Sequence, residues 1–394
     1  MNIKIKINEN NSDLWLSRLF ISVVLIKAAN LTFHNTDLIP DRIESVFFCL
    51  FVLFYLFSLF VSTLVYNRRK QGLILLVATL FSLMYFLPYI KYPQIRSNIE
   101  RRFIWTVILN IPVFGSAYNI HDFDIFYNTI YKYTFIISVF GTMIFIGDTT
   151  ILSSNTSFSA MMLFPICMHL ISIENARIKI LQLLLCVYEI FIIFSHGSRG
   201  SLLVVFIFII SCILLKKRVR LKLTKAKIII SAAIVFAGGI VIFNLGQLLK
   251  YIENREFSIR NLRFLMGGNF LDANGRFSIQ LDYLQKMFLN SPVRFAPVDL
   301  QNYGSFYPHN IFLEIVWDYG YLLGPLLIIL FISVFIKRIS YIRGNEFKIV
   351  MALFGAGFLP LLFSFTYTEW PLFWALIGYL CKYIKVKKAE ILYE

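Results

Sequence analysis

Residues 201–227 read SLLVVFIFIISCILLKKRVRLKLTKAK, an apolar run that passes directly into a strongly basic one. The apolar part is typical of a helix that crosses a membrane. The basic part is typical of a cytoplasmic loop, where lysine and arginine accumulate. Another apolar run follows at 228–248. This succession of apolar run, basic loop and apolar run is the pattern from which the rest of the chain can be interpreted.

The composition of the whole chain agrees with this pattern. Of 394 residues, 58% are hydrophobic and 15% are charged, whereas about 25% of the residues of an ordinary soluble domain are charged. Backbone amides in lipid must be paired within their own segment, so we expect an all-α polytopic membrane protein. The formal net charge is +16. Most of the basic residues fall in short loops between apolar runs, which favours a positive-inside topology over nucleic-acid binding.

The apolar runs predict about 12 transmembrane helices with both chain ends in the cytoplasm. The expected spans are 14–33, 46–66, 72–90, 103–117, 130–146, 160–173, 178–194, 201–215, 228–248, 309–336, 349–365 and 372–384. The one long polar segment then lies outside, between spans nine and ten, and contains an amphipathic helix at about 277–288. Three regions follow: transmembrane helices 1–9 (residues 1–248), a periplasmic loop (249–308) and transmembrane helices 10–12 (309–394).

Spans three to five fit the charge rule least well. The basic loop 91–102 falls outside and the acidic loop 121–124 falls inside, and both positions oppose the usual bias. Arg18 and Lys27 lie within the first span, where we expect their long side chains to extend to the nearest interface.

No metal or cofactor site is evident in the sequence. The five cysteines lie in apolar spans without metal-type spacing, and the five histidines are far apart, so we expect free thiols and no metal. Asp122-Phe123-Asp124 has the form that some nucleotide-sugar enzymes use to hold a metal, but this short pattern is common by chance. The topology also places it on the cytoplasmic side, so we do not assign it as a site.

Two polar motifs contain arginines at the ends of expected helices. Ser198-Arg199-Gly200 opens span eight, where Ser198 can cap the helix. Arg199 and the first amides then point together at an anion. Asn274-Gly275-Arg276 is a turn directly before the amphipathic helix. Each has a plainer explanation when taken alone: an interfacial arginine against lipid phosphate, and an ordinary surface turn.

The third motif, Tyr307-Pro308-His309-Asn310-Ile311-Phe312-Leu313-Glu314, opens span ten. Pro308 suits a helix start, so we expect His309 in the first helical turn. On a helix, Asn310 and Glu314 share one face. An ionisable residue inside a membrane is a functional candidate, although Glu314 could also pair with an arginine for structure alone.

Together these motifs resemble the O-antigen polymerase and O-antigen ligase superfamily. The resemblance rests on Ser198-Arg199-Gly200 at the start of a span, Gly275-Arg276 before a helix, and Pro308-His309-Asn310-x-x-Leu313-Glu314 followed by Gly320 and Gly324. We expect span ten to be interrupted near these two glycines. The resemblance implies a multi-pass protein of the bacterial inner membrane with its active site facing the periplasm. It also implies a metal-independent, inverting glycosyltransferase whose donor is an undecaprenyl-diphosphate-linked oligosaccharide.

The resemblance also implies roles for individual residues. Arg199 and Arg276 would clamp the diphosphate and stabilise the charge that develops on it. His309 would be the general base, or would orient the acceptor hydroxyl. Glu314 would support His309 in catalysis, and Asn310 and Ser198 would support substrate binding.

Three functions remain open. A polymerase joins lipid-linked repeat units, and a ligase transfers the finished glycan to the lipid A core. We favour the polymerase because polymerases are the more numerous and divergent branch. A transporter or flippase predicts polar residues along a transmembrane path and pseudo-symmetric halves, whereas these motifs gather at one face. The expected partners are the lipid-linked oligosaccharide and membrane lipids, with a chain-length regulator left open; no cofactor and no nucleic acid are expected.

Overall fold

The computed structural model describes residues 9–33, 41–65, 68–147, 156–175, 178–196, 199–216, 276–286, 291–295 and 308–390. Every regular element within these ranges is a helix, which confirms the all-α class. The expected ninth span and most of the long polar segment lie outside the described residues.

The first part of the chain supplies nine of the helices that the structure describes. They are α1 (Glu9–Phe33), α2 (Asp41–Val65), α3 (Arg68–Lys91), α4 (Arg96–Phe103), α5 (Ile111–Asn119), α6 (Phe123–Gly147), α7 (Thr156–Ser172), α8 (Lys179–His196) and α9 (Arg199–Lys216). A π-helical stretch, η2 (Ile104–Asn110), joins α4 to α5, so the chain is helical without a break from 96 to 119.

The C-terminal part is more interrupted. Its helices are α13 (Arg276–Lys286), α14 (Ile311–Tyr319), α15 (Leu323–Ile339), α16 (Gly344–Leu353) and α17 (Pro371–Glu390). Three short elements connect α16 to α17: a π-helical turn η6 (Phe354–Phe358) and two 3-10 turns, η7 (Leu359–Leu362) and η8 (Tyr367–Glu369). The amphipathic helix expected at 277–288 is confirmed as α13, and the expected interruption of span ten is confirmed at Gly320–Leu322.

Apolar side chains cover the outside of the molecule as well as its core. Among the described residues, five helical stretches are long and apolar enough to cross a membrane: Ser12–Thr32, Glu44–Leu64, Gln71–Lys91, Phe123–Ile146 and Gly344–Leu362. Phe60 on α2 and Leu75 on α3 are 63% and 65% exposed and have many exposed apolar neighbours. An apolar surface of this extent is unfavourable in water, so the chain is a membrane-embedded helical protein.

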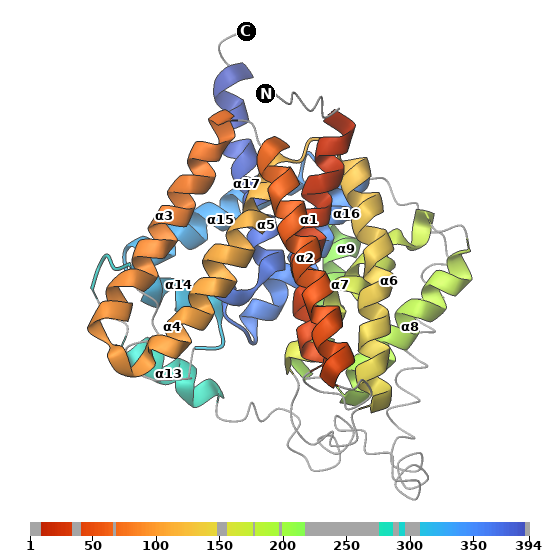
Figure 1. Ribbon diagram of the computed structural model, residues 1–394, viewed down its shortest axis with the longest axis horizontal. Coiled ribbons are helices and arrows are strands. Elements are labelled where there is room, and N and C mark those ends of the chain that lie inside the picture. Colours follow the sequence, from red (N-terminus) through yellow and green to blue (C-terminus); the bar gives the residue numbers. More distant parts are fainter. Residues whose placement is uncertain are drawn as a thin grey trace, which may run out of the picture.

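The helices form a bundle around α1. Its side chains Leu19, Phe20 and Ile21 are fully buried, and it packs against α2, α5 and α6. Helices α5 and α17 pack very closely, because a Cβ added at Gly378 would collide with the backbone of Phe114. Figure 1 shows that α1 begins and α17 ends at the same end of the bundle, while α4, α13 and α14 lie in the other half.

Candidate functional site

The turn at 366–370, Thr-Tyr-Thr-Glu-Trp, connects several distant parts of the chain; we call it the hub turn. Thr366 caps the 3-10 turn η8 by accepting a hydrogen bond from the Thr368 amide at 3.3 Å. Phe365, just before it, has a φ of 68°, a left-handed conformation that is uncommon for a bulky residue. Strain of this kind persists only where the surrounding structure enforces it, and it is concentrated at functional sites.

One side of the hub turn holds two buried carboxylates from α14. Glu314 is 1% exposed. Its carboxylate accepts from the Thr366 hydroxyl and, at 3.4 Å, from the Tyr367 amide. A buried carboxylate is costly unless it is hydrogen-bonded, so these donors hold Glu314 and the hub turn together.

Asp318 lies one helical turn further along α14 and is also 1% exposed. It accepts from the Tyr367 hydroxyl at 2.8 Å. Burial, together with Asp318, raises the pKa of Tyr367 well above its usual value, so the hydroxyl stays protonated and donates. Arg294 provides nearby positive charge: burial lowers the pKa of its guanidinium and the Asp318 carboxylate opposes that shift, so Arg294 remains cationic.

The other side of the hub turn is basic. Lys27 of α1 donates to the Glu369 carbonyl at 2.6 Å. Its ammonium lies 4.6 Å from the centre of the Trp105 ring and 5.0 Å from that of Trp370, and both are cation–π distances. The expectation that Lys27 reaches for a lipid interface is therefore wrong, because a carbonyl and two aromatic faces inside the protein hold its charge.

Arg101 and Arg102 of α4 add to this basic side. The Glu369 carboxylate lies 3.7 Å from Arg101 Nη2 and 4.0 Å from Arg102 Nε. Two arginines thus lie near the Glu369 carboxylate and Lys27 binds the carbonyl of the same residue, so three cations gather on this side of the hub turn. Both arginines belong to the basic segment 91–102 and contact the hub turn through Glu369.

The middle of the hub turn is anchored to the helix that runs from 96 to 119. The Thr368 carbonyl accepts from Thr106 Oγ1 at 3.0 Å and from Asn110 Nδ2 at 2.8 Å. The Thr106 hydroxyl also meets the Tyr85 hydroxyl of α3 at 2.9 Å. Both Thr106 and Asn110 lie in the π-helical stretch η2, a distortion that is frequent at functional sites.

The segment 291–295 closes the site against the break in span ten. Gly320 has a φ of 92°, and a Cβ added there would lie 2.5 Å from the Pro292 carbonyl oxygen. That carbonyl accepts from the Leu322 amide at 2.9 Å, and the Arg294 amide donates to the Tyr319 carbonyl at 2.9 Å. The glycine therefore permits a close backbone contact that satisfies groups freed by the break.

The helix α13 packs on the same region. Tyr283 and Trp317 are both buried, with ring centres 5.1 Å apart in an edge-to-face arrangement. The Trp317 indole also donates to the Tyr283 carbonyl at 3.1 Å. This contact ties part of the long polar segment to α14.

The start of α14 differs from the expected geometry in one respect. The first helical residue is Ile311, so the expectation that His309 lies in the first turn is wrong. Asn310 is the N-cap, and its side-chain oxygen accepts from the amides of Phe312 and Leu313 at 3.0 and 3.3 Å. His309 precedes the cap with a φ of 53°. Asn310 also donates to the Leu362 carbonyl at 3.3 Å, which holds the start of α14 against η7.

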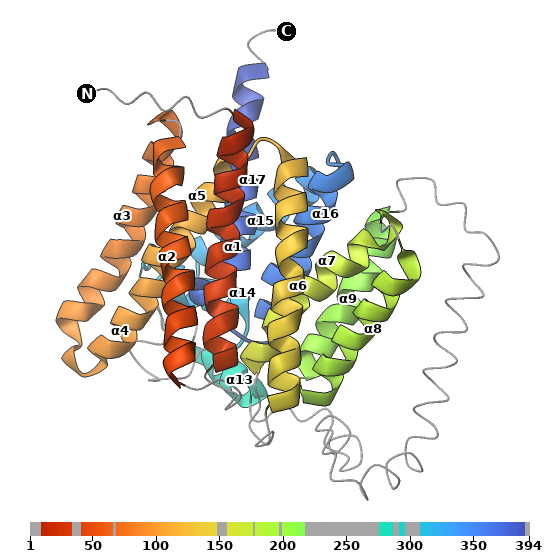
Figure 2. The same cartoon turned by 45° about the vertical axis from the view of Figure 1, so that its right-hand side comes forward.

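The two arginines of the expected clamp each begin a helix. Arg199 is the first residue of α9 and Arg276 is the first residue of α13. Figure 2 shows α9 starting at the end of the bundle where α13 lies. Ser198 lies outside the described residues.

The acidic pattern at 122–124 has a structural role. Asp122 caps α6 by accepting from the Asp124 and Ile125 amides at 2.8 and 3.0 Å, and Asp124 accepts from Asn345 at 2.8 Å. Within the described ranges, no group of three or more His, Cys, Asp or Glu side chains is arranged to hold a metal ion.

A second buried polar cluster lies between α6, α7 and α8. His169 and Glu189 are both fully buried, with Nδ1 of the imidazole 2.8 Å from Glu189 Oε1. Ser138 donates to the same carboxylate at 2.5 Å, and Thr134 meets the other ring nitrogen at 3.0 Å. Polar side chains shared between helices stabilise packing in a membrane, and this cluster joins three helices away from the hub turn.

Comparison with protein-family models gives no match, and comparison with curated proteins gives no significant match. The class therefore follows from the structure itself: a helical membrane protein with an acidic and cationic site built around one turn. Lys27, Arg101, Arg102, Arg294 and Asp318 were not selected from the sequence. The charge-rule conflict at 91–102 pointed to Arg101 and Arg102, and the place of Lys27 within an apolar span pointed to Lys27.

Proposed function

We propose that this chain is an O-antigen polymerase, an inverting glycosyltransferase that joins undecaprenyl-diphosphate-linked repeat units at the periplasmic face of the inner membrane. The proposal includes about 12 spans, both chain ends in the cytoplasm, and the hub turn at the periplasmic end. It rests on the motifs at 198–200, 274–276 and 308–314 and on the way the hub turn connects the last of these to a basic cluster.

The observation that carries the proposal is the group of cations on one side of the hub turn. A donor that leaves as a lipid diphosphate develops negative charge on phosphate oxygens, and preorganised donors in a low-dielectric site stabilise such charge. Lys27 and the largely buried Arg102 supply positive charge from the N-terminal half, and the exposed Arg101 adds to it. Arg199 and Arg276 would contribute from the starts of α9 and α13. Arginine also binds phosphate through two parallel hydrogen bonds.

The reaction is a single displacement. A hydroxyl oxygen of the acceptor sugar attacks the anomeric carbon of the donor, and the bond from that carbon to the diphosphate oxygen breaks. The electron pair leaves with the lipid diphosphate, and the hydroxyl proton passes to His309. His309 has a left-handed φ of 53° directly before the Asn310 cap, a strained conformation of the kind that occurs at functional sites. Glu314 is a positioning residue, because its carboxylate is occupied by the hub turn.

Deletion of the gene tests this proposal through the banding of surface polysaccharide on a gel. Loss of the polymer ladder, with core plus a single repeat unit remaining, is the expected result. Bare core with accumulated lipid-linked polymer would instead identify the ligase, which shares the donor chemistry. An unchanged ladder would overturn both assignments and favour a transporter.

Complementation of the deletion strain tests the arginines. Arg199→Lys and Arg276→Lys should each abolish the ladder, because lysine keeps the charge but cannot hold two phosphate oxygens at once. Arg18→Lys is the matched control, since Arg18 lies 4.5 Å from the Trp15 ring rather than at the hub turn. A normal ladder from either test variant would remove that arginine from the clamp.

A further inference from the structure

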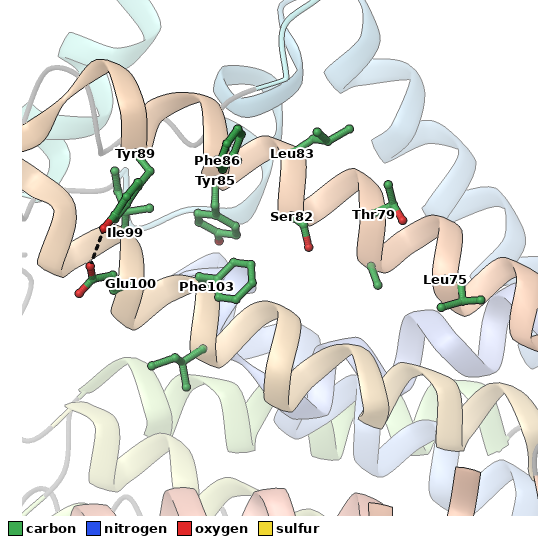
Figure 3. Close-up of a pocket in the computed structure, with 12 residues that line it drawn as sticks. Leu75, Thr79, Ser82, Leu83, Tyr85, Phe86, Tyr89, Ile99, Glu100 and Phe103 are labelled. Atoms are coloured by element: carbon green, nitrogen blue, oxygen red, sulfur yellow. Dashed lines mark hydrogen bonds between the residues drawn. The ribbon is translucent and has the colours of Figure 1, made fainter. Parts of the chain in front are cut away.

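An apolar groove of about 750 Å³ lies between α3 and α4. Its wall is formed by leucine and aromatic side chains with a few small residues; Leu75, Ser82, Leu83, Phe86 and Phe103 are among them. Figure 3 shows Leu75 at one end of the groove and Tyr89 with Glu100 at the other. The 14 residue steps from Leu75 to Tyr89 span about 20 Å along a helix, so the groove follows about two thirds of the hydrocarbon core of a bilayer.

The groove opens on the lipid-facing side of the bundle. Leu83 and Phe86 are 48% and 57% exposed, and the stretch Gln71–Lys91 of α3 is one of those apolar enough to cross a membrane. An apolar chain could therefore enter the groove sideways from the bilayer without passing through water.

The floor of the groove is also a wall of the candidate site. Tyr85 lines the groove, is 1% exposed, and its hydroxyl meets Thr106, which donates to the Thr368 carbonyl of the hub turn. One aromatic side chain thus separates apolar space from the polar network around the hub turn. A molecule in the groove would lie directly beside that network.

The end of the groove near Tyr89 is polar: the Glu100 carboxylate lines it, and basic residues lie on the segments beside it. The Tyr89 hydroxyl donates to Glu100 at 3.1 Å, and Arg96 donates to the Tyr89 carbonyl at 3.2 Å. The exposed residues Lys91 and Arg101 lie on the segments that frame this end. The three cations Lys91, Arg96 and Arg101 flank this end against the single carboxylate of Glu100, so the groove complements an anionic lipid with its chain along α3 and its head toward α4.

We propose that this groove holds the first isoprene units of the polyprenyl chain of the donor, with the diphosphate directed over α4 toward the hub turn. This rests on the proposed function: a donor whose head reaches the hub turn would lie against Tyr85, which the groove and the site share. The volume lies within the range of about 300–1,000 Å³ typical of small-molecule sites, so the groove accommodates part of the chain and leaves the remainder in the bilayer.

Binding to the full-length protein in phosphatidylcholine nanodiscs tests the groove directly. Undecaprenyl diphosphate is titrated against the unmodified protein, Leu83→Trp and Leu87→Trp. Leu83 lines the groove, whereas Leu87 is exposed on the same helix and is not among the groove residues. Leu83→Trp should weaken binding about tenfold or more, because the larger side chain would displace part of the polyprenyl chain. The loss of burial of two of its methylene groups already corresponds to about a factor of ten in affinity. Leu87→Trp should bind as the unmodified protein does.

Two further probes identify the occupant. Inorganic diphosphate should compete weakly with undecaprenyl diphosphate, and to the same extent for both variants, since it has no apolar chain to bind in the groove. Phosphatidylglycerol at the same concentration should not displace undecaprenyl diphosphate, and equal displacement would show a general lipid contact and overturn the proposal. Unchanged binding by Leu83→Trp would also overturn it.

The result is separable from that of the proposed function. A lost polysaccharide ladder in the deletion strain together with unchanged binding by Leu83→Trp would retain the polymerase and reject the groove. Weakened binding by Leu83→Trp together with an unchanged ladder in the deletion strain would retain the groove and reject the polymerase.

Discussion

Thr366→Val is the most direct test of the hub turn. Thr366 is 6% exposed, and its hydroxyl donates to the Glu314 carboxylate, meets the Thr368 hydroxyl at 2.7 Å and accepts from the Thr368 amide. Valine has nearly the same shape, so the substitution removes these interactions without opening a cavity. Thr366→Ser keeps the hydroxyl and is the matched control.

The expected loss of stability can be estimated from these contacts. A hydrogen bond to a charged group contributes about 1.5–3 kcal/mol, and a neutral one about 0.5–1.5 kcal/mol. Because Glu314 is buried and keeps only part of its hydrogen bonding, Thr366→Val should lower the free energy of unfolding by about 2–4 kcal/mol. Thr366→Ser should cost about 1 kcal/mol or less, as expected for a lost methyl group.

The assay is thermal unfolding of the full-length protein in one detergent. The heating rate is kept the same for all variants, because large proteins commonly unfold irreversibly and their apparent Tm then depends on that rate. Thr366→Val should lower the apparent Tm by on the order of 5 °C, and the polysaccharide ladder should be lost in complementation. If valine and serine variants behave alike in both measurements, then the hydroxyl does not hold Glu314, and the proposed role of the hub turn in organising the site is incorrect.

Other substitutions test separate parts of the structure. Gly320→Ala should be severely destabilising in thermal unfolding, because the added Cβ would collide with a carbonyl at a residue whose φ is already left-handed. Gly344 has a φ of 59° but open space around it, so Gly344→Ala should cost about 1 kcal/mol. Equal effects of the two substitutions would refute the packing of 291–295 on the break. Glu189→Ala should cost about 1–3 kcal/mol because it leaves the buried His169 imidazole and the Ser138 hydroxyl without this acceptor. Glu189→Gln should cost clearly less, and similar Tm values for the two variants would refute the hydrogen-bonded pair with His169. Lys27→Met should lower polymer per cell about tenfold or more, since a lost charged hydrogen bond of about 1.5–3 kcal/mol corresponds to at least that factor; normal polymer at normal protein level would remove Lys27 from the site.

Much of the helical framework could be predicted because apolar runs report it locally. A stretch such as 201–215 must be helical in a membrane whatever surrounds it, and α9 forms there. The interruption of span ten was also predictable, because Gly320 and Gly324 are local signals of backbone freedom. The start of α14 was misplaced by two residues, since Pro308 and Asn310 both mark helix starts and the side-chain cap of Asn310 prevails.

The site was predicted only in part. His309, Asn310 and Glu314 form a compact motif, so a sequence pattern can report them. Lys27, Arg101 and Asp318 belong to helices far apart in the chain, and their shared site exists only because the hub turn contacts α1, α4 and α14 together. A lysine within an apolar span looks the same in sequence whether it extends to lipid or binds a carbonyl inside the protein.

Composition and the lengths of the apolar runs are enough to establish an all-α membrane protein, because they depend only on the solvent that each segment can tolerate. Local patterns also indicate where a helix can break and which polar motifs are available. Tertiary packing is needed to bring two buried carboxylates and three cations to the turn at 366–370, and to place Tyr85 between this site and an apolar groove. Those contacts depend on the packing of helices separated by hundreds of residues, which local residue preferences do not encode.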